Sequence, residues 1–228
     1  MSLKNRVTCR IPGSTSNCGS GFDTLGLALS VYNHLTIERV AAGLGEEGNG
    51  VDIFPESEMS QDTAALFFKE AGVEPFEIKT RIRGEVPRAR GLGSSVTVRG
   101  GILAGLSALA GIDWSKDKLV ELVTRLEGHP DNASASIMGG FTVSKFSDTP
   151  ADWSDTMKFA IGEDVRFIVV SPEYEVLTSS SRGILPEVID FGKVVGSLNG
   201  VSCLIAAIAS GRFDALADTV KDFVHEPY

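Results

Sequence analysis

The chain has 228 residues, of which 43% are hydrophobic and 22% are charged, as in ordinary globular proteins. Its formal net charge of −9, without a long run of Lys or Arg, argues against a nucleic-acid partner or an anionic membrane surface. Three scattered cysteines, Cys9, Cys18 and Cys203, argue against a disulfide scaffold or a zinc site and indicate a cytoplasmic protein. No apolar stretch of ~20 residues predicts a membrane span, and no signal-peptide core is found.

The first half of the chain is expected to be mostly strands. Four segments alternate apolar and polar residues, as half-buried strands do: Arg6–Ile11, Leu35–Val40, Val51–Phe54 and Phe76–Arg83. A helix is predicted over Asp62–Ala71. The segment 13–26 is rich in Gly, Ser and Asn and is too long to be an idle connection in a compact domain, so we expect it to carry function.

A glycine-rich segment, Pro87-Arg88-Ala89-Arg90-Gly91-Leu92-Gly93-Ser94-Ser95-Val96, follows the last of these strands. The run of aliphatic residues that begins at Val96 predicts a buried helix that ends near Gly111. Unpaired N–H groups and the positive end of the helix dipole make such a junction an anion site, most often for phosphate. The pattern is neither a Walker A loop nor a dinucleotide fingerprint. A flexible turn is the alternative interpretation.

The second half is predicted to contain three more helices and two more strands. One helix has Ser115 as its N-cap and ends at Gly128, with Glu121 opposite its apolar face. The remaining elements are expected at Phe141–Phe146, Val165–Val170, Val194–Ala209 and Phe213–Phe223. Strands mixed with helices and without strict alternation favour an α+β fold. The Asp-, Ser- and Pro-rich segment 147–155 suggests a boundary between domains 1–150 and 151–228.

Three motifs give the chain a family resemblance. The Pro87–Val96 segment resembles the nucleotide loop of the GHMP kinases. Residues 11–26, IPGSTSNCGSGFDTLG, resemble the N-terminal signature of the homoserine kinase branch, and Glu127–Asn132, EGHPDN, with the later Gly-Gly-Phe matches that branch as well. The resemblance implies a two-domain fold, with an N-terminal mixed α/β ATP-binding domain and a C-terminal α+β, ferredoxin-like layer. It also implies that this layer is truncated here, since the family runs to roughly 300 residues.

The resemblance further implies transfer of the ATP γ-phosphate to the hydroxyl of L-homoserine, on the path to threonine. Mg²⁺ would be held by the Ser95 hydroxyl and by Glu121, eleven residues before Asn132, with Glu127 as the alternative carboxylate. The ATP phosphates would be bound by the loop residues Pro87, Arg90, Gly91, Leu92, Gly93, Ser94 and Ser95. The catalytic set would be Ser95, Glu121 and Asn132, and a homodimer is expected.

Homoserine carries an ammonium, a carboxylate and a hydroxyl, so its pocket needs carboxylate, amide, imidazole and guanidinium groups. The matching substrate-binding positions are Asn17, Asp23, His129, Asp131, Asn132 and Arg182. Mevalonate-kinase-like relatives carry an aspartate base where this chain has Asn132, so no protein general base is expected. Two alternatives stay open: another small-molecule GHMP kinase, or a catalytically silent homoserine- or nucleotide-binding fragment.

Overall fold

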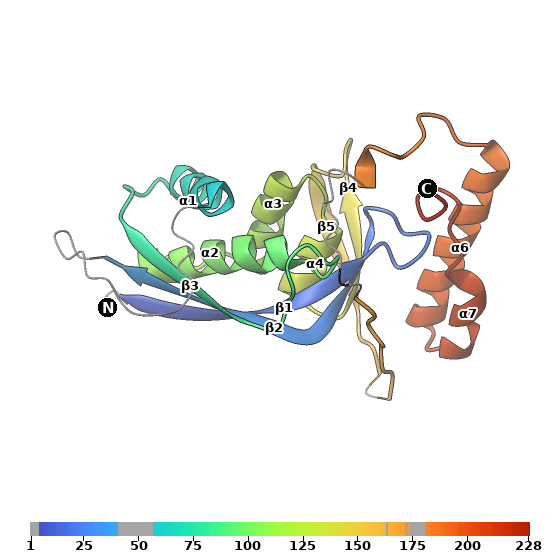
Figure 1. Ribbon diagram of the computed structural model, residues 1–228, viewed down its shortest axis with the longest axis horizontal. Coiled ribbons are helices and arrows are strands. Elements are labelled where there is room, and N and C mark those ends of the chain that lie inside the picture. Colours follow the sequence, from blue (N-terminus) through green and yellow to red (C-terminus); the bar gives the residue numbers. More distant parts are fainter. Residues whose placement is uncertain (1–4, 41–56, 163, 172, 174–180) are drawn as a thin grey trace.

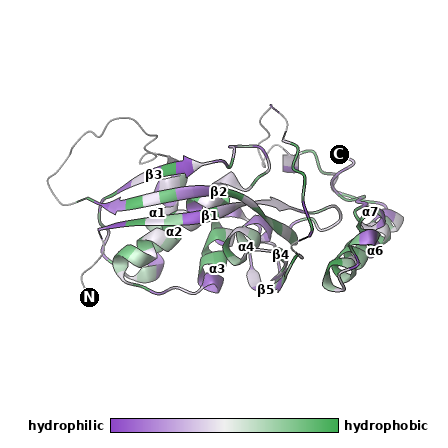
Figure 2. Ribbon diagram, turned by 90° about the horizontal axis from the view of Figure 1, so that it is seen from below, coloured by the Kyte–Doolittle hydropathy of each residue, from purple (hydrophilic) through white to green (hydrophobic). Residues whose placement is uncertain are grey.

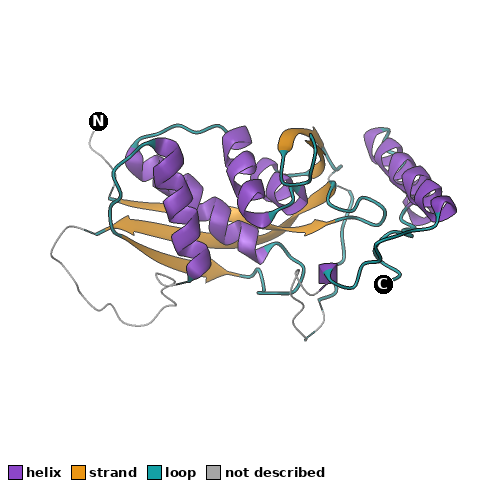
Figure 3. Ribbon diagram, turned by 90° about the horizontal axis from the view of Figure 1, so that it is seen from above, coloured by secondary structure: helices purple, strands orange, loops and turns teal. Residues whose placement is uncertain are grey.

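The computed structural model describes residues 5–40, 57–162, 164–171, 173 and 181–228. Its centre is a five-stranded antiparallel sheet, and helices α1 to α4 cover one face of that sheet (Figures 1 and 3). Helices α6 and α7 lie side by side at one end of the sheet, away from α1 to α4. The predicted α+β class is confirmed.

The sheet is organised around one long strand. The strands are β1 (Arg6–Ser16), β2 (Leu25–Arg39), β3 (Ile78–Gly84), β4 (Phe141–Phe146) and β5 (Trp153–Phe159). All of β2 lies beside β1, while its second half pairs with β3 and its first residues pair with β4, which in turn pairs with β5. Apolar and polar residues alternate along β1 to β3, as Figure 2 shows. The predicted strand Val51–Phe54 lies outside the described residues.

The helices are α1 (Glu58–Ala71), α2 (Ser94–Ala110), α3 (Lys116–Glu127), α4 (Asp131–Met138), α6 (Phe191–Ala209) and α7 (Leu216–Thr219). The predicted helix that begins after Ser115 and ends at Gly128 is found at its expected bounds, while α4 was not predicted. Ser115 caps α3 by accepting a hydrogen bond from the Lys118 amide, and Gly128 ends it in the left-handed conformation. Helix α4 follows directly, and its N-terminus holds the predicted Asp131 and Asn132.

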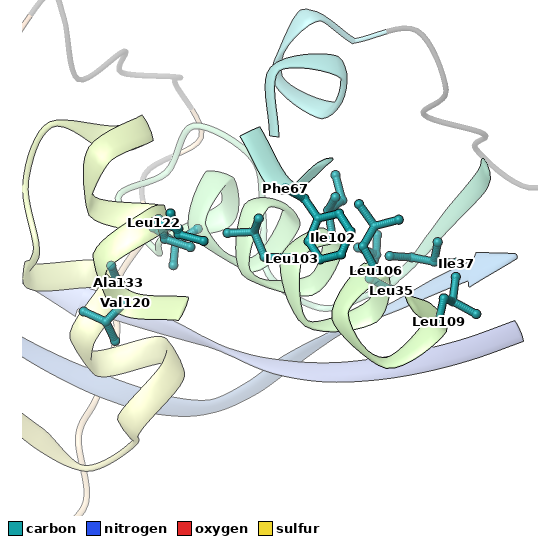
Figure 4. Close-up of a cluster of buried hydrophobic side chains, with 12 residues drawn as sticks. Leu35, Ile37, Phe67, Ile102, Leu103, Leu106, Leu109, Val120, Leu122 and Ala133 are labelled. Carbon is teal, nitrogen blue, oxygen red and sulfur yellow. The ribbon is translucent and has the colours of Figure 1, made fainter. Parts of the chain in front are cut away.

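The main core lies between the sheet and the helices. Helix α2 is apolar on nearly every side, which suits a helix packed on all sides. Its residues Ile102, Leu103 and Leu106 are fully buried against Leu35 of β2 and Phe67 of α1 (Figure 4). This packing fixes the N-terminal end of α2, where the glycine-rich segment stands.

A second core cluster joins the start of β2 to α6. Leu25, Leu27 and Leu29 pack with Leu204 and Ile208 of α6. Between them, Gly26 faces α4, and a Cβ there would lie 2.2 Å from the Asp131 carbonyl oxygen. Because side chains alternate along a strand, β2 uses one face for α6 and brings α4 against the other. The close approach at Gly26 places Asp131 and Asn132 next to the N-terminal segment.

Several expectations about the second half are wrong. Residues 165–170 form no strand, and Ile168 and Val170 are 93% and 87% exposed, because no neighbouring strand pairs with them. The predicted helix 213–223 is reduced to a 3-10 turn at Phe213–Ala215 and the short α7. Strand β5 pairs with β4, so one sheet includes residues on both sides of the proposed boundary at residue 150, and the division into two domains stays a prediction.

One described helix departs from the expectation that no apolar stretch is long enough for a membrane. Helix α6 has the length and composition of a spanning segment over Phe191–Ala209. A single helix of this kind is weak support for a span, since core helices pass the same test. Leu204 and Ile208 of α6 belong to the second core cluster.

Candidate active site

A pocket of about 700 Å³ opens where the glycine-rich segment, the starts of α2 and α4 and the C-terminal residues meet. Twelve of the residues predicted for ATP or substrate line it: Asn17, Asp23, Arg90, Gly91, Leu92, Gly93, Ser94, Ser95, His129, Asp131, Asn132 and Arg182. Pro87 lies outside the lining, and so does Glu121. The structure therefore brings together residues that are up to 165 positions apart in the chain.

The glycine-rich segment leaves the start of α2 open to the pocket. Gly91 and Gly93 have φ angles of 71° and 64°, in the left-handed region that favours glycine. Gly93 is the N-cap of α2 and supplies no side-chain hydrogen bond, so the first amides of the helix are uncapped by a side chain. The Ser14 amide donates to the Leu92 carbonyl at 3.2 Å, which ties the segment to β1. This geometry suits an anion such as phosphate.

The carboxylate beside Ser95 belongs to Glu127. Ser95 Oγ donates to Glu127 Oε2 at 2.8 Å, and Arg99 Nε donates to the other carboxylate oxygen at 2.6 Å. Both partners of the ion pair are largely buried, with side-chain exposures of 14% for Arg99 and 12% for Glu127. A hydroxyl and a carboxylate side by side, at the mouth of an anion site, are the hard oxygen donors that Mg²⁺ prefers.

Glu121 is not at this position. Its carboxylate binds Lys118 Nζ at 3.1 Å and lies 3.6 Å from Arg125 Nη1, within a surface network that includes Glu70. Residues six positions apart on an α-helix point about 120° apart, so Glu121 and Glu127 face different directions from α3. Glu121, the residue eleven positions before Asn132, therefore does not line the pocket. The alternative carboxylate, Glu127, lines it.

The pocket is also lined by two pairs of acidic and basic side chains. Arg182 binds the Asp23 carboxylate through both terminal nitrogens, with Nη1 to Oδ2 at 3.0 Å. His129 Nδ1 lies 2.7 Å from Asp131 Oδ1. Donor atoms of Asp23, His129 and Asp131 all lie within 4.8 Å of one another. A ligand that carries both an ammonium and a carboxylate finds partners of both signs here.

The imidazole of His129 is biased toward its charged form. Burial alone would lower the pKa of His129, but the hydrogen bond and the charge of Asp131, with the charge of Asp23, outweigh it and raise the pKa. Asp23 and Asp131 place two carboxylates close to this ring, and both can accept hydrogen bonds from an ammonium group.

The N-terminal segment that carries Asp23 is held in an unusual backbone conformation. Asn17, Cys18 and Asp23 have φ angles of 66°, 47° and 55°, which non-glycine residues rarely adopt. Asn17 Oδ1 accepts a hydrogen bond from the Asp23 amide at 3.1 Å. Strain of this kind is kept where the surroundings determine the conformation, and it often marks a functional segment.

Sequence reasoning gave no role to several pocket residues. His225 and Tyr228 line the pocket from the end of the chain, and the His225 ring packs on Phe22 with centroids 4.8 Å apart. The sequence signal for them is the segment His225-Glu226-Pro227-Tyr228, which resembles a family motif but lies far from the other motifs.

Comparisons with known proteins show the family of the chain. The model of the N-terminal domain of the GHMP kinases matches residues 58–140. The homoserine kinase of Prochlorococcus marinus is 36% identical over 240 residues, which cover 99% of this chain and 73% of that protein. The homoserine kinase of Carboxydothermus hydrogenoformans is 35% identical, with 97% and 73% covered. The chain belongs to the homoserine kinase family. It spans about three quarters of the length of these relatives.

Solved structures show that the fold is that of the same superfamily. A homoserine kinase from Cytophaga hutchinsonii superposes with a TM-score of 0.78 at 20% identity, over 100% of this chain and 75% of that one. The phosphomevalonate kinase of Streptococcus pneumoniae, solved with phosphomevalonate and AMPPNP, gives a TM-score of 0.68 at 14% identity, over 94% and 77%. The family resemblance read from the three motifs is confirmed.

Proposed function

We propose that the chain catalyses transfer of the γ-phosphoryl group of ATP to the side-chain hydroxyl of L-homoserine. The observation that carries the proposal is a single pocket lined both by an open helix N-terminus and by the pairs Asp23–Arg182 and His129–Asp131. The helix N-terminus suits the phosphates of ATP. The two pairs suit the ammonium and carboxylate of an amino acid.

ATP is held mainly by backbone groups in this proposal. The amides of Gly91 to Ser95 surround the β- and γ-phosphates, so little positive side-chain charge is needed in a chain of net charge −9. Mg²⁺ fits the donor set of the Ser95 hydroxyl and the Glu127 carboxylate, which lie 2.8 Å apart. When bound, the ion neutralises charge on the phosphates.

Homoserine is oriented by the charged side chains of the pocket. Asp23 and Asp131 attract its ammonium group, and Arg182 attracts its carboxylate while still paired with Asp23. Holding both ends of the amino acid points its side-chain hydroxyl toward the glycine-rich segment. Serine, one methylene shorter, would reach less far in the same orientation, so the pocket length sets the preference for homoserine.

The transfer itself needs positioning more than proton abstraction. The hydroxyl oxygen forms a bond to the γ-phosphorus, the bond from that phosphorus to the bridging oxygen of ADP breaks, and ADP leaves. The proton of the hydroxyl passes to the transferred phosphate or to water. Asn132, at the start of α4, offers an amide and no base at this point of the pocket. A loose transition state tolerates the absence of a protein base.

Product analysis tests the proposal. The chain is incubated with Mg²⁺ and ATP together with L-homoserine, L-serine, L-threonine or a non-amino-acid alcohol such as mevalonate, and the products are followed by ³¹P NMR. We expect a phosphomonoester signal with L-homoserine at a rate at least about tenfold above that with serine. Phosphorylation of mevalonate alone would instead identify another GHMP kinase activity. Binding of ATP without transfer to any acceptor would favour the silent binding module.

The proposal has consequences for the cell. O-phospho-L-homoserine is the product, and we place the reaction in the cytoplasm on the path to threonine. A homodimer is the assembly that we propose, and size-exclusion chromatography with light scattering distinguishes it from a monomer.

A further inference from the structure

A buried chain of hydroxyl groups ends on the pocket residue Asn132. Ser136 Oγ donates to Ser14 Oγ at 2.9 Å, and Ser14 Oγ donates to Asn132 Oδ1 at 2.8 Å. Ser14 is fully buried and Ser136 is 3% exposed, so water cannot replace either partner easily. These hydrogen-bonded hydroxyl groups connect β1 to the first two turns of α4.

This arrangement decides which end of the Asn132 amide faces a ligand. The oxygen of the amide is already used by Ser14, whereas the nitrogen Nδ2 has no hydrogen-bond partner among the described residues and is not buried. Because Asn132 lines the pocket, its NH₂ group is the end available to a ligand. With the amide rotated, the Ser14 hydroxyl would lose Oδ1 as its acceptor at 2.8 Å and keep only the Asn132 backbone carbonyl at 3.4 Å, so the orientation with Oδ1 toward Ser14 has the better hydrogen bonds.

We infer that Ser14, oriented by Ser136, is a positioning residue that presents the NH₂ group of Asn132 to the reacting groups. Asn132 then acts as a hydrogen-bond donor, either to the γ-phosphate or to the oxygen of the acceptor hydroxyl, and cannot accept the hydroxyl proton. The inference rests on the proposed function for its kinetic consequence, while the orientation of the amide can be tested without turnover.

The chain offers a matched control for the test. A second buried pair, Ser144 Oγ to Ser134 Oγ at 2.8 Å, also joins α4 to the sheet but does not reach Asn132. Ser144 is 4% exposed, so Ser144→Ala removes a hydroxyl of similar burial. Ser14→Ala removes only the side-chain hydroxyl, because the bond to the Leu92 carbonyl comes from the Ser14 amide.

The kinetic experiment compares kcat and KM for L-homoserine and ATP. Ser14→Ala should lower kcat about tenfold, with the KM for ATP unchanged within about twofold, and Ser136→Ala should lower kcat about threefold. Ser144→Ala should leave kcat unchanged although its melting temperature falls as much as that of Ser14→Ala. In an Asn132→Ala background, Ser14→Ala should have no further effect on kcat. Equal kcat values for Ser14→Ala and Ser144→Ala, or additive losses, would overturn the inference.

An NMR experiment separates this inference from the proposed function. The side-chain NH₂ signals of Asn132 are identified in ¹⁵N-labelled protein by their loss in Asn132→Ala. They should shift in Ser14→Ala and stay in place in Ser144→Ala. Unshifted signals in Ser14→Ala would overturn the inference whatever the activity. Shifted signals in a chain that does not phosphorylate homoserine would support the positioning role and contradict the proposed function.

Discussion

The two parts of the pocket are held in place by different means. The phosphate part stands on α2, whose residues Ile102, Leu103 and Leu106 are fully buried against the sheet. The acceptor part depends partly on residues after 180, where Val188 and Phe191 are 84% and 80% exposed. Leu204 and Ile208 of α6 pack on β2, but the pocket residues of this part are held by polar and ring contacts, Arg182 with Asp23 and His225 with Phe22.

The comparison distinguishes residues that stabilise the fold from residues that contribute mainly to the proposed site. Burial of apolar side chains around α2 stabilises the fold and fixes the phosphate site at the same time. The C-terminal residues contribute charge and ring contacts to the acceptor site while burying less apolar surface. Substitutions of the buried residues of α2 should therefore change both the free energy of unfolding and activity. Substitutions of Arg182 or His225, which contact the N-terminal segment by charge or ring packing, should change activity more than stability.

The largest effect is expected for Glu127 of α3. Glu127→Gln removes the carboxylate beside Ser95 and should lower kcat/KM for Mg²⁺–ATP about 1000-fold, because the Mg²⁺ ion that would neutralise charge on the transferring phosphoryl group loses its proposed carboxylate ligand. Glu121→Gln is the matched control and should leave activity within about twofold, since that residue binds Lys118 on the surface. Steady-state kinetics over a range of Mg²⁺ concentrations checks both. A large loss of activity in Glu121→Gln with little loss in Glu127→Gln would instead favour Glu121 as the metal ligand.

A pair of leucines compares packing in the two regions. Leu106→Ala, in the fully buried face of α2, should lower the free energy of unfolding by about 3 kcal/mol. Leu198→Ala, 59% exposed on α6, should change it by less than about 0.5 kcal/mol. Urea denaturation followed by circular dichroism measures both values. Equal losses in the free energy of unfolding would show that α6 is packed as tightly as α2 and would contradict the proposed difference between the two regions.

A substitution of Arg182 tests whether this residue contributes to the proposed homoserine site. Arg182→Lys keeps the charge but loses the two-nitrogen contact with Asp23, so the KM for homoserine should rise about tenfold with little change in the KM for ATP. Arg212→Lys, whose partner Asp214 is 73% exposed, is the control and should be neutral. An unchanged homoserine KM in Arg182→Lys would exclude Arg182 from the acceptor site.

The smallest effect is a pH dependence that comes from His129. Its pKa is raised above the unfolded value, so its contribution to stability is full below about pH 6.5 and is lost as pH rises through the higher folded value. The gap in melting temperature between wild type and His129→Asn should therefore narrow from about pH 6 to about pH 9. A gap that widens with rising pH would mean that the imidazole is held neutral.

The sequence predicted those elements whose ends depend on a few neighbouring residues. Ser115 and Gly128 mark the ends of α3 because caps depend on a few neighbouring residues. Strand β4 was predicted at its observed bounds, Phe141–Phe146, because its apolar run is framed by turn residues. Helix α4 was missed, since its first six residues are small or polar and no side chain caps its start. Its position depends on packing against Gly26.

The candidate site was predictable where a motif is continuous along the chain. The glycine-rich segment and the start of α4 are of this kind. The choice between Glu121 and Glu127 depends on the direction in which α3 presents each residue toward Ser95, which spacing alone did not give. The apolar pattern at 165–170 gave a wrong prediction of a strand, because a strand also needs a neighbouring strand to pair with.

The most direct test of the central claim is the rate of ADP release by the chain with Mg²⁺–ATP, measured with and without L-homoserine. The account predicts a rate that depends on homoserine and saturates with it, and that falls to background in Glu127→Gln. ADP release that is the same with and without homoserine, or none at all in a folded chain that binds ATP, would contradict it.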